Sequence, residues 1–526
     1  MDRRSFLRSA GLVGGGSLIA PGLLSACSNA DETSVTSTTS TTSTGATSTT
    51  TPKASLSTRM LDLPASASPI THVVVVMMEN RSFDHWLGWL KSDETWLEQG
   101  RSRFGGDFDV AGVQSQKFRS GSDEVATAHL LDYLADGDPW RGCGHPDPGH
   151  GWDHGRAQRD SGFLAEGSGN DPFALGYYLG ADLAFTSTLA KRFTVCDQSF
   201  ASVLGPTYPN REYLHSGQSG GNKTNYLPLG EGGFTWPTIW DRLETAGVSH
   251  GYYFTDLPVT ALWGGRLDSF THPIDDYFQR CADGTLPEVT FVDPGFLTGS
   301  RTDNHPHGDV RSGEAFQRDV FKAFAESPHW EDGLFVLTYD EWGGFFDHVA
   351  PPVFADDRSA NIDAENFGQA GFRVPTILAS PYVASGSVDH TVYDHTSILR
   401  FLEWRFLGAP ATGTGSVGDD WFLTARDRNA NNLASGFVME PVTDIGMDLD
   451  VAIDPPSPWC AEDMPEDASA STDGATGADS TSDGIRSATR GAQYKPHSFE
   501  DAYHAGYFER VGYDVGPTAM AEQWRY

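Results

Sequence analysis

Two continuous apolar runs, each ending in adjacent polar side chains, constrain the fold of this chain most strongly. The first covers residues 72–78 and is followed directly by Glu79–Asn80. The second covers residues 334–339 and is followed by Asp340–Glu341. Runs of this kind are typical of strands that are buried on both faces of a parallel sheet. Two such strands with oxygen ligands at their carboxyl ends predict one metal site at one edge of an open α/β sheet.

Apolar strand-like runs alternate with amphipathic helical patterns along most of the chain. This alternation predicts βαβ units and a mostly parallel sheet. We expect strands at residues 72–78, 192–197, 250–254, 288–292, 334–339 and 374–379. We expect helices at residues 81–91, 173–190, 236–246, 311–326 and 394–406. Two stretches rich in Gly, Pro and Asp, 141–170 and 255–285, are too long for simple connections and are predicted to be active-site loops or small inserted elements.

The charge balance of the chain restricts the classes of partner. The 526 residues contain 36 Lys and Arg against 71 Asp and Glu, a formal net charge of −35. Binding to phosphate backbones needs basic surface, so we expect no nucleic-acid partner. The same balance disfavours unaided docking on anionic membranes, and it is typical of a solubility adaptation in an exported protein.

The first residues have the pattern of an export signal. Residues 2–8 contain a twin-arginine motif, an apolar Gly-rich segment follows, and residues 24–27 form a lipobox that ends in Cys27. We therefore interpret residues 1–27 as a twin-arginine lipoprotein signal peptide, with Cys27 as the lipidation site. This predicts passage through the twin-arginine export machinery and a location in the cell envelope, lipid-anchored to the outer face of the membrane or secreted. An uncleaved anchor or a soluble exported protein is the alternative.

Composition divides the rest of the chain. Residues 28–58 are mostly Ser, Thr and Ala, which predicts a disordered tether, and residues 462–490 predict a disordered linker of similar character. Between them, residues 59–461 form the expected globular domain, and residues 491–526 form an aromatic C-terminal tail that packs on the domain or contacts a partner.

Outside the signal, no cysteine pair has metal-ligand spacing, and one or two disulfides are compatible with an oxidising compartment. These cysteines are Cys143, Cys196, Cys281 and Cys460.

Thr207 is the candidate nucleophile. It lies between Pro206 and Pro209, in a segment that cannot be the middle of a helix, and Arg211 follows four residues later. A hydroxyl beside a metal ion can become a nucleophile because the metal favours the alkoxide. A nearby arginine can hold an anionic phosphoryl oxygen bidentately. Taken alone, a threonine in such a segment is more often a turn residue.

In combination and in order, these stretches resemble the bacterial phosphoesterase family that contains nonspecific phospholipases C and a group of acid phosphatases. This family belongs to the alkaline phosphatase and sulfatase-like superfamily. The resemblance covers roughly residues 70–440. The stretches that carry it are residues 72–85 (HVVVVMMENRSFDH), 205–211 (GPTYPNR), 305–306 (HP), 339–352 (YDEWGGFFDHVAPP), 373–375 (RVP), 380–381 (SP), 394–397 (DHTS) and 423–427 (LTARD).

The resemblance implies a three-layer α/β/α sandwich of the alkaline phosphatase type, with a mostly parallel central sheet and long active-site loops. It implies metal ligation by two pairs of adjacent residues and by Thr207, which is also the implied nucleophile. The two pairs match Glu79 with Asn80 and Asp340 with Glu341. His305 matches a histidine that protonates the leaving alcohol, His150 matches a phosphate-contacting histidine, and His348 is a further catalytic candidate that could instead fix the loop after its strand.

Two departures from the family pattern affect the expected pocket. Trp342 stands where the family usually has a histidine after Tyr-Asp-Glu, which removes a polar contact. His305–His307 reads His-Pro-His in place of the more usual His-Pro-Pro. The chain also has no room for the additional C-terminal β domains of the longer phospholipases C.

The function implied is that of a metal-dependent phosphoesterase. It would hydrolyse phospholipid phosphodiesters in the manner of a phospholipase C, to diacylglycerol and a phosphorylated head group. An acid phosphatase acting on monoesters and a non-catalytic cell-surface lipoprotein are the alternatives. A sulfatase is disfavoured because no Cys-x-Pro-x-Arg run exists. The oxygen ligands favour Ca²⁺ or Mg²⁺, and the neighbouring histidines keep Zn²⁺ open.

Overall fold

The computed structural model describes residues 58–456 and 499–524, except residues 136, 229–231, 298, 414–420 and 519. The described residues belong to one compact unit, Leu56–Tyr526. The predicted signal peptide with Cys27, the tether as far as residue 57, the linker at 462–490 and Cys460 lie outside the described residues. Within the described part of the chain, no helix is long and apolar enough to cross a membrane.

The centre of the fold is an eight-stranded sheet with the order β13-β6-β12-β11-β1-β10-β8-β9. Strand β1 pairs in parallel with β10 and β11, and only β12 runs antiparallel to its neighbours. This confirms the expected mostly parallel sheet. The strands of the sheet are β1 (His72–Met78), β6 (Thr194–Cys196), β8 (His250–Phe254), β9 (Thr271–Pro273), β10 (Val289–Asp293), β11 (Gly333–Tyr339), β12 (Ile377–Ala379) and β13 (Val388–Asp389).

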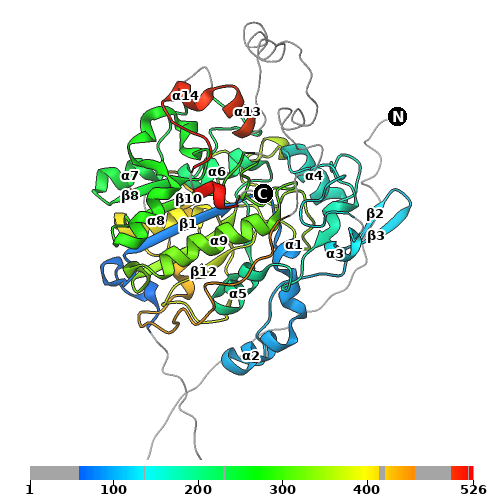
Figure 1. The fold of residues 1–526 in the computed structure, drawn as a ribbon, viewed down its shortest axis with the longest axis horizontal. Helices are drawn as coiled ribbons and strands as arrows, with labels where there is room; N and C mark the ends of the chain where they lie inside the picture. Colours follow the sequence, from blue (N-terminus) through cyan, green and yellow to red (C-terminus); the bar gives the residue numbers. More distant parts are fainter. Residues whose placement is uncertain are drawn as a thin grey trace, which may run out of the picture. The chain divides into compact units, whose positions relative to one another are not determined.

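Helices cover both faces of this sheet, which confirms the three-layer α/β/α class. Figure 1 shows α5 and α9 in front of the strands, and α8 contacts α9 in the same layer. In the other layer, α6 contacts both α7 and α10. The helices of the domain are α1 (Phe83–Leu87), α2 (Glu94–Phe104), α3 (Leu130–Tyr133), α4 (Trp152–Ser161), α5 (Ala184–Arg192), α6 (Thr207–Ser216), α7 (Ile239–Ala246), α8 (Ile274–Asp283), α9 (Val310–Ala325), α10 (Thr396–Leu402) and α11 (Ala425–Asn429).

Three small strand pairs and a C-terminal helical segment complete the described structure. The pairs are β2 (Lys117–Ser120) with β3 (Asp123–Ala126), β4 (Ala128–His129) with β5 (Gly176–Tyr177), and β7 (Ser199–Phe200) with β14 (Tyr393–Asp394). The segment carries α13 (Phe499–His504) and α14 (Tyr507–Val511) and ends in a 3₁₀ turn, Met520–Trp524.

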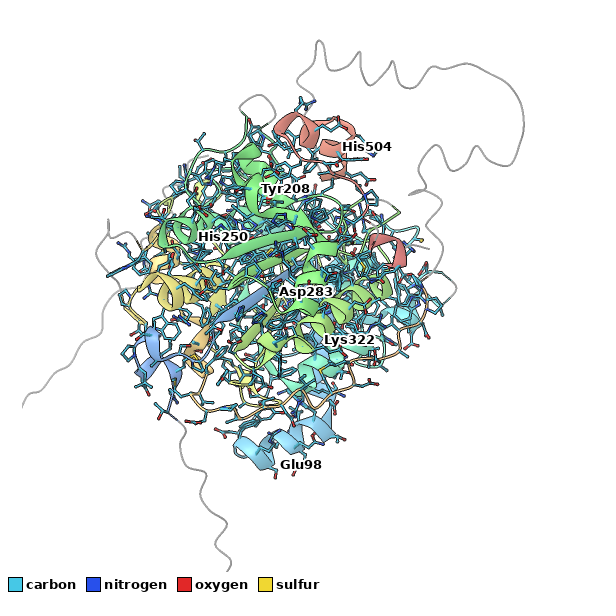
Figure 2. The ribbon with its side chains drawn as sticks, turned by 60° about the vertical axis from the view of Figure 1, so that its left-hand side comes forward. Glu98, Tyr208, His250, Asp283, Lys322 and His504 are labelled. Carbon is cyan, nitrogen blue, oxygen red and sulfur yellow. The ribbon has the colours of Figure 1, made fainter. Side chains whose placement is uncertain are left out.

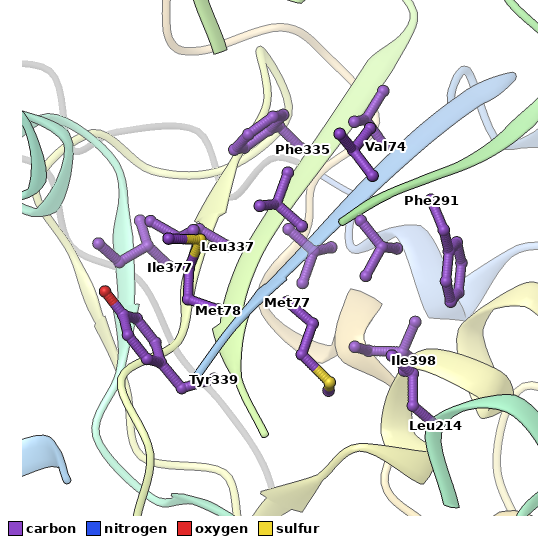
Figure 3. Packing of buried hydrophobic residues seen from close by; sticks show 14 of the residues in the cluster. Val74, Met77, Met78, Leu214, Phe291, Phe335, Leu337, Tyr339, Ile377 and Ile398 are labelled. Carbon is purple, nitrogen blue, oxygen red and sulfur yellow. The ribbon is translucent and has the colours of Figure 1, made fainter. Parts of the chain in front are cut away.

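The core alternates about β1, because successive side chains of a strand point to opposite faces. Figure 3 shows Met77 and Met78 on opposite sides of the strand, with Leu214 of α6 and Ile398 of α10 on the side of Met77. Six consecutive residues of β1, Val73–Met78, are at most 2% exposed. Full burial on both faces explains why the run is continuously apolar rather than alternating.

Each of the six predicted strands is present, with shifts of one to three residues at some ends. The predicted helix at 173–190 is wrong in its first half. A 3₁₀ turn (Pro172–Leu175) and β5 occupy that part, and α5 begins only at Ala184. Proline at the start of the turn and glycines at 176 and 180 interrupt the helical pattern. The long stretches at 141–170 and 255–285 contain inserted elements, namely α4, and a 3₁₀ helix (Val259–Phe270) with β9 and α8.

Candidate active site

The two acidic pairs meet at the carboxyl ends of the two central strands. Met78 and Tyr339, the last residues of β1 and β11, are paired in register, so the residues that follow are brought side by side. The backbone N–H of Asp340 donates to the carbonyl of Met78 at 3.1 Å, and the N–H of Asn80 donates to Asp340 Oδ1 at 3.1 Å. The predicted metal pairs therefore form one cluster at the edge of the sheet.

A left-handed backbone at Asn80 turns this side chain into the cluster. Its φ is +59°, a conformation that asparagine tolerates better than other residues with a side chain. The loop after β11 passes close by. A Cβ atom on Gly343 would lie 2.1 Å from the Asn80 carbonyl oxygen, and Gly343 itself has a φ of +63°. The Gly-Gly step after the second acidic pair is thus required for the two strand ends to approach.

Arg211 lies beneath the cluster and is 1% exposed. Its Nε donates to Asp340 Oδ2 at 3.0 Å, one Nη lies 3.4 Å from Asp293 Oδ1, and the other lies 3.8 Å from Glu79 Oε2. It also donates to the carbonyls of Met77 and Met78. The predicted contact between Arg211 and substrate phosphate is not supported by this placement, because the guanidinium is buried among protein acceptors. Its position is that of a counter-charge for the carboxylates.

The carboxylates are held in an environment that disfavours their charge. Burial has the largest effect on the pKa of Asp340 and raises it. Arg211 lowers this pKa and the charge of Glu79 raises it, and the resulting value is about 8. Burial and the neighbouring Asp340 raise the pKa of Glu341 well above its usual range. Three carboxylates share the one guanidinium of Arg211, and a cation among them would remove this penalty.

The donor atoms fit a divalent cation. Asn80 Oδ1 and Glu341 Oε1 are buried and have no hydrogen-bond partner within the described part of the chain. Buried polar atoms without partners are costly, so an ion that accepts these lone pairs would satisfy them. Glu79, Asp340 and Thr207 supply further oxygen atoms beside them. A different group, Asp147, His150 and His305, has one ligand atom per residue within 4.8 Å of the others.

Thr207 is the first residue of α6 and is 2% exposed. Its Oγ1 donates a hydrogen bond to Glu79 Oε1 at 3.1 Å. Pro206 caps the helix and Pro209 lies in its first turn, where a missing N–H has no intrahelical partner to lose. The segment therefore begins a helix, one that was not among the predicted helices. The amino end of a helix favours an anionic group at this hydroxyl.

Thr207 lines a cavity of about 190 Å³ together with two of the predicted histidines. The rings of His150 and His305, which both line it, meet edge to face with their centroids 6.0 Å apart. The cavity is lined by Glu79, Asp147, His150, Thr207, Tyr208, Asn225, Phe296, Arg301, Asp303, His305 and Glu500. The structure thus brings together Glu79, Thr207, His150 and His305, as the sequence predicts.

His305 is oriented by groups that sequence reasoning did not find. Its Nδ1 lies 2.8 Å from the carbonyl of Pro306, so that nitrogen carries the proton and Nε2 faces Asp147 Oδ2 at 3.6 Å. Arg301 Nη1 lies 3.4 Å from His305 Nδ1, and the backbone N–H of His305 donates to Asp303 Oδ1 at 2.9 Å. Burial and Arg301 lower the pKa of His305, against the raising effect of Asp147.

His348 does not belong to this cavity. Its Nδ1 lies 2.6 Å from Asp84 Oδ2, in a buried network with Asp347 and Arg373. Arg373 donates to both carboxylates and to the carbonyls of Ala111 and Asp197. The candidate catalytic role of His348 is not supported by this position. The side chain instead fixes the loop after β11.

Four pocket residues with charged side chains were missed: Asp147, Arg301, Asp303 and Glu500. Asp303 lies two residues before the predicted His305, so a polar residue beside a candidate was the signal that could have found it. Trp342, expected to alter the pocket, is fully buried and donates to Gln158 Oε1 of α4 at 2.7 Å. It connects the inserted α4 with the loop after β11.

Cys143 is disulfide-bonded, whereas Cys196 and Cys281 are buried free thiols.

A second hollow adjoins the cavity. It has a volume of about 410 Å³ and shares Asp147, His150 and Asn225 with it. Trp152 and Lys223 line its far part. A substrate phosphate beside Thr207 would therefore have space for an organic group on the side of α4.

An α/β fold that places a hydroxyl, a carboxylate and two histidines in one cavity at the carboxyl edge of the sheet, beside a buried carboxylate cluster, is typical of a hydrolase of phosphoric esters. Comparison with known proteins agrees. The chain belongs to the Phosphoesterase family, whose model matches residues 70–407. The family predicted from the sequence is confirmed.

Similar curated proteins include plant and bacterial enzymes. Non-specific phospholipase C5 of Arabidopsis thaliana is 32% identical over 409 residues, which cover 70% of this chain and 74% of that protein. Phospholipase C B of Mycobacterium tuberculosis is 29% identical over 441 residues, covering 71% and 78%. Among solved structures, a protein in the alkaline phosphatase superfamily from Vibrio parahaemolyticus is 12% identical, with a TM-score of 0.28 over 52% of this chain and 69% of that one.

Proposed function

We propose that this phosphoesterase is a metal-dependent enzyme that cleaves phospholipid phosphodiesters like a phospholipase C, releasing diacylglycerol and a phosphorylated head group. The observation that carries the proposal is the single cavity shared by Thr207, Glu79, His150 and His305. The names of the similar proteins support the reaction class. The adjoining hollow supports a diester, because a diester needs room for organic groups on both sides of its phosphorus.

The residues of the chain divide the chemistry among them. Thr207 Oγ1, whose hydrogen already points to Glu79 Oε1, attacks phosphorus and transfers that proton to the Glu79 carboxylate. The bond between phosphorus and the leaving alcohol breaks, and the imidazolium form of His305, which carries a proton on both ring nitrogens, gives its Nε2 proton to the departing oxygen. Water then attacks phosphorus and breaks the bond to Thr207 Oγ1. One proton of this water returns to His305 Nε2, and the proton held by Glu79 returns to Oγ1. A divalent ion bound by Glu79, Asn80, Asp340 and Glu341 would neutralise the negative charge that develops on the phosphoryl oxygens.

A phosphomonoesterase of the acid phosphatase type is the second candidate. The cavity of about 190 Å³ at Thr207 is large enough for a phosphate group but small for a lipid head group. If the adjoining hollow is not used, a monoester would be the better substrate.

The substrate class is tested with two chromogenic esters, p-nitrophenylphosphorylcholine and p-nitrophenyl phosphate, with and without chelator. We expect chelator-sensitive turnover of the choline diester. Turnover of the monoester alone would move the protein to the acid phosphatase type. No turnover of either ester by protein that purifies without metal would favour a non-catalytic surface lipoprotein.

The nucleophile is tested with Thr207→Ala and Thr207→Ser. We expect Thr207→Ala to lower kcat by about 10³-fold or more with little loss of stability, because the variant lacks the attacking oxygen. Thr207→Ser keeps that oxygen and should retain measurable turnover. Full activity of Thr207→Ala would remove Thr207 from the nucleophile role.

We also propose that the protein is exported by the twin-arginine machinery and anchored to the membrane through acylated Cys27. The sequence of residues 1–27 supports this. Metabolic labelling with palmitate should mark the wild type and leave Cys27→Ser unlabelled. Equal labelling of both proteins would contradict the proposal.

A further inference from the structure

One wall of the catalytic cavity comes from the C-terminal segment, residues 499–524. Glu500 of α13 lines the same cavity as Thr207 and His305, although it lies far beyond residue 407, where the match to the family model ends. Figures 1 and 2 both place α13 above α6. The segment is therefore part of the site and not only a tail.

The segment is held on the domain by buried anchors. Tyr507 and Phe508 of α14 are each 1% exposed, and Tyr507 Oη donates to the carbonyl of Ala261 at 2.7 Å. At its end, Trp524 Nε1 donates to Asp319 Oδ2 of α9 at 3.1 Å. Both contacts are made by residues that follow α13 in the chain, and they hold α13 with Glu500 in place at the cavity.

Glu500 faces Arg301, the cation that lines the cavity. Its Oε2 accepts from Arg301 Nη2 at 3.4 Å, and its side chain remains 24% exposed. Arg301 also donates to the carbonyl of Phe296 at 3.2 Å and lies near His305. A guanidinium at this place would attract an anionic substrate group, and the carboxylate of Glu500 offsets that attraction.

The remaining charges at the cavity entrance are also negative. Asp147, 40% exposed at its side chain, lies on the other side of His305. Glu79 is among the proposed metal ligands, and Asp303 is buried, with a pKa raised well above its usual range by desolvation. Arg301 also lies 3.9 Å from Asp303 Oδ2, so the carboxyl groups that line the cavity outnumber its one guanidinium.

We propose that Glu500 is a specificity-determining residue that favours substrates whose non-reacting group is cationic over substrates whose group is neutral or anionic. This inference rests on the proposed function and extends it to the choice of head group. Two effects of Glu500 have the same sign: its charge attracts a substrate cation, and its pairing with Arg301 prevents that residue from acting as an anion site.

The test compares binding of phosphocholine and glycerol 3-phosphate by calorimetry, using the full chain as wild type and as Glu500→Gln. We expect the wild type to prefer phosphocholine. Glu500→Gln should reduce the ratio of the Kd for glycerol 3-phosphate to the Kd for phosphocholine roughly two- to fivefold, as for one partly exposed charge pair. Arg301→Gln should move the ratio in the opposite direction. An unchanged ratio in Glu500→Gln, or no binding of either ligand by the wild type, would overturn the proposal.

Glu509→Gln is the matched control. Glu509 belongs to the same segment, is exposed and does not line the cavity, so the same chemical change there should leave the ratio unchanged. The outcome is independent of the proposed reaction. If the wild type hydrolyses no phosphodiester, the phospholipase C proposal fails, while the binding ratio still decides the role of Glu500.

Discussion

Arg211 shows at the scale of one residue how burial determines what a charged side chain can do. Its spacing from Thr207 is compatible with binding of substrate phosphate, and nothing in the sequence distinguishes that role from another. In the structure the guanidinium is surrounded by Asp340, Asp293 and Glu79. It therefore lowers the cost of holding three carboxylates in one buried place.

Replacing Arg211 with methionine should destabilise the protein rather than only weaken substrate binding. Removing one partner from buried ion pairs leaves uncompensated charge, a cost of about 3–5 kcal/mol in the free energy of unfolding. Urea unfolding in the presence of chelator measures it. Unchanged stability combined with a raised KM alone would instead support the phosphate-binding role.

The two histidines His305 and His348 should respond differently to the same substitution. We expect His305→Gln to lower kcat by about 10²–10⁴-fold, because the leaving oxygen loses its acid. His348→Gln should lose the contact with Asp84, lower the stability of the loop after β11 and leave kcat within a few fold. Steady-state kinetics with the active ester and thermal unfolding separate the effects. Equal losses of kcat would contradict this assignment.

Residue by residue, the sequence was informative where a side chain follows directly on a predicted strand. The acidic pairs after β1 and β11 could be found in this way, since strand ends lie at one edge. Asp147, Arg301 and Glu500 could not, because they lie in loops or in a distant helix and only the folded chain brings them to the cavity.

Among the elements, α5 and α9 show how one side chain can hold two helices together. Glu314 of α9 accepts from the backbone N–H groups of Phe185 and Thr186 at 2.7 and 3.0 Å. It thereby satisfies the open first turn of α5, which begins without a side-chain cap of its own. The sequence did not predict that α5 begins only at Ala184. The missing cap at this helix start is replaced by Glu314, which lies 128 positions from Thr186.

Glu314 also gives this pair of helices a dependence on pH. Burial raises its pKa from 4.5 to about 7, so the folded state holds the proton more tightly than the unfolded state. Its contribution to stability is therefore largest below pH 4.5 and falls as the pH rises from 4.5 to 7, by about 1.4 kcal/mol per unit.

The variant Glu314→Gln should lack this dependence. We expect the free energy of unfolding of the wild type, measured relative to Glu314→Gln, to fall between about pH 4.5 and 7. Urea titrations across this range provide the measurement. Parallel pH profiles of the two proteins would show that Glu314 does not titrate in the folded state.

Helix α6 was not predicted because its prolines suggest a turn. Pro206 and Pro209 exclude the middle of a helix, and this inference was correct, but they are compatible with a helix start. The central strands, by contrast, have no local signal that conflicts with their burial on both faces, so their presence could be predicted, whereas the order of the strands depends on the folded chain.

For the whole molecule, the C-terminal segment connects the outermost part of the fold to the catalytic cavity. Trp524 packs edge-on against Phe316 of α9, with ring centroids 5.3 Å apart, and is 2% exposed. The aromatic composition of the C-terminal segment predicted packing on the domain or on a partner, and the described residues of the segment pack on the domain. Which cavity residue it supplies depends on tertiary placement that no sequence pattern encodes.

Trp524→Ala should release the segment locally. We expect a loss of about 3–5 kcal/mol of packing energy, faster hydrogen exchange over residues 499–524 and a shift in ligand preference like that of Glu500→Gln. Exchange mass spectrometry and the binding ratio measure both effects. Gln523→Ala, an exposed neighbour, is the control, and protection unchanged from wild type in Trp524→Ala would contradict the anchoring role.

The position of β1 at the centre of the sheet has a consequence for synthesis of the chain. Both neighbours of this strand, β10 and β11, lie more than 200 residues downstream, starting at Val289 and Gly333. At a translation rate of about 5–20 residues per second, the nascent strand waits roughly 10–40 s with both edges open. Residues 72–78 are then the segment most exposed to misassociation on the ribosome, and the place where we expect a chaperone to bind first.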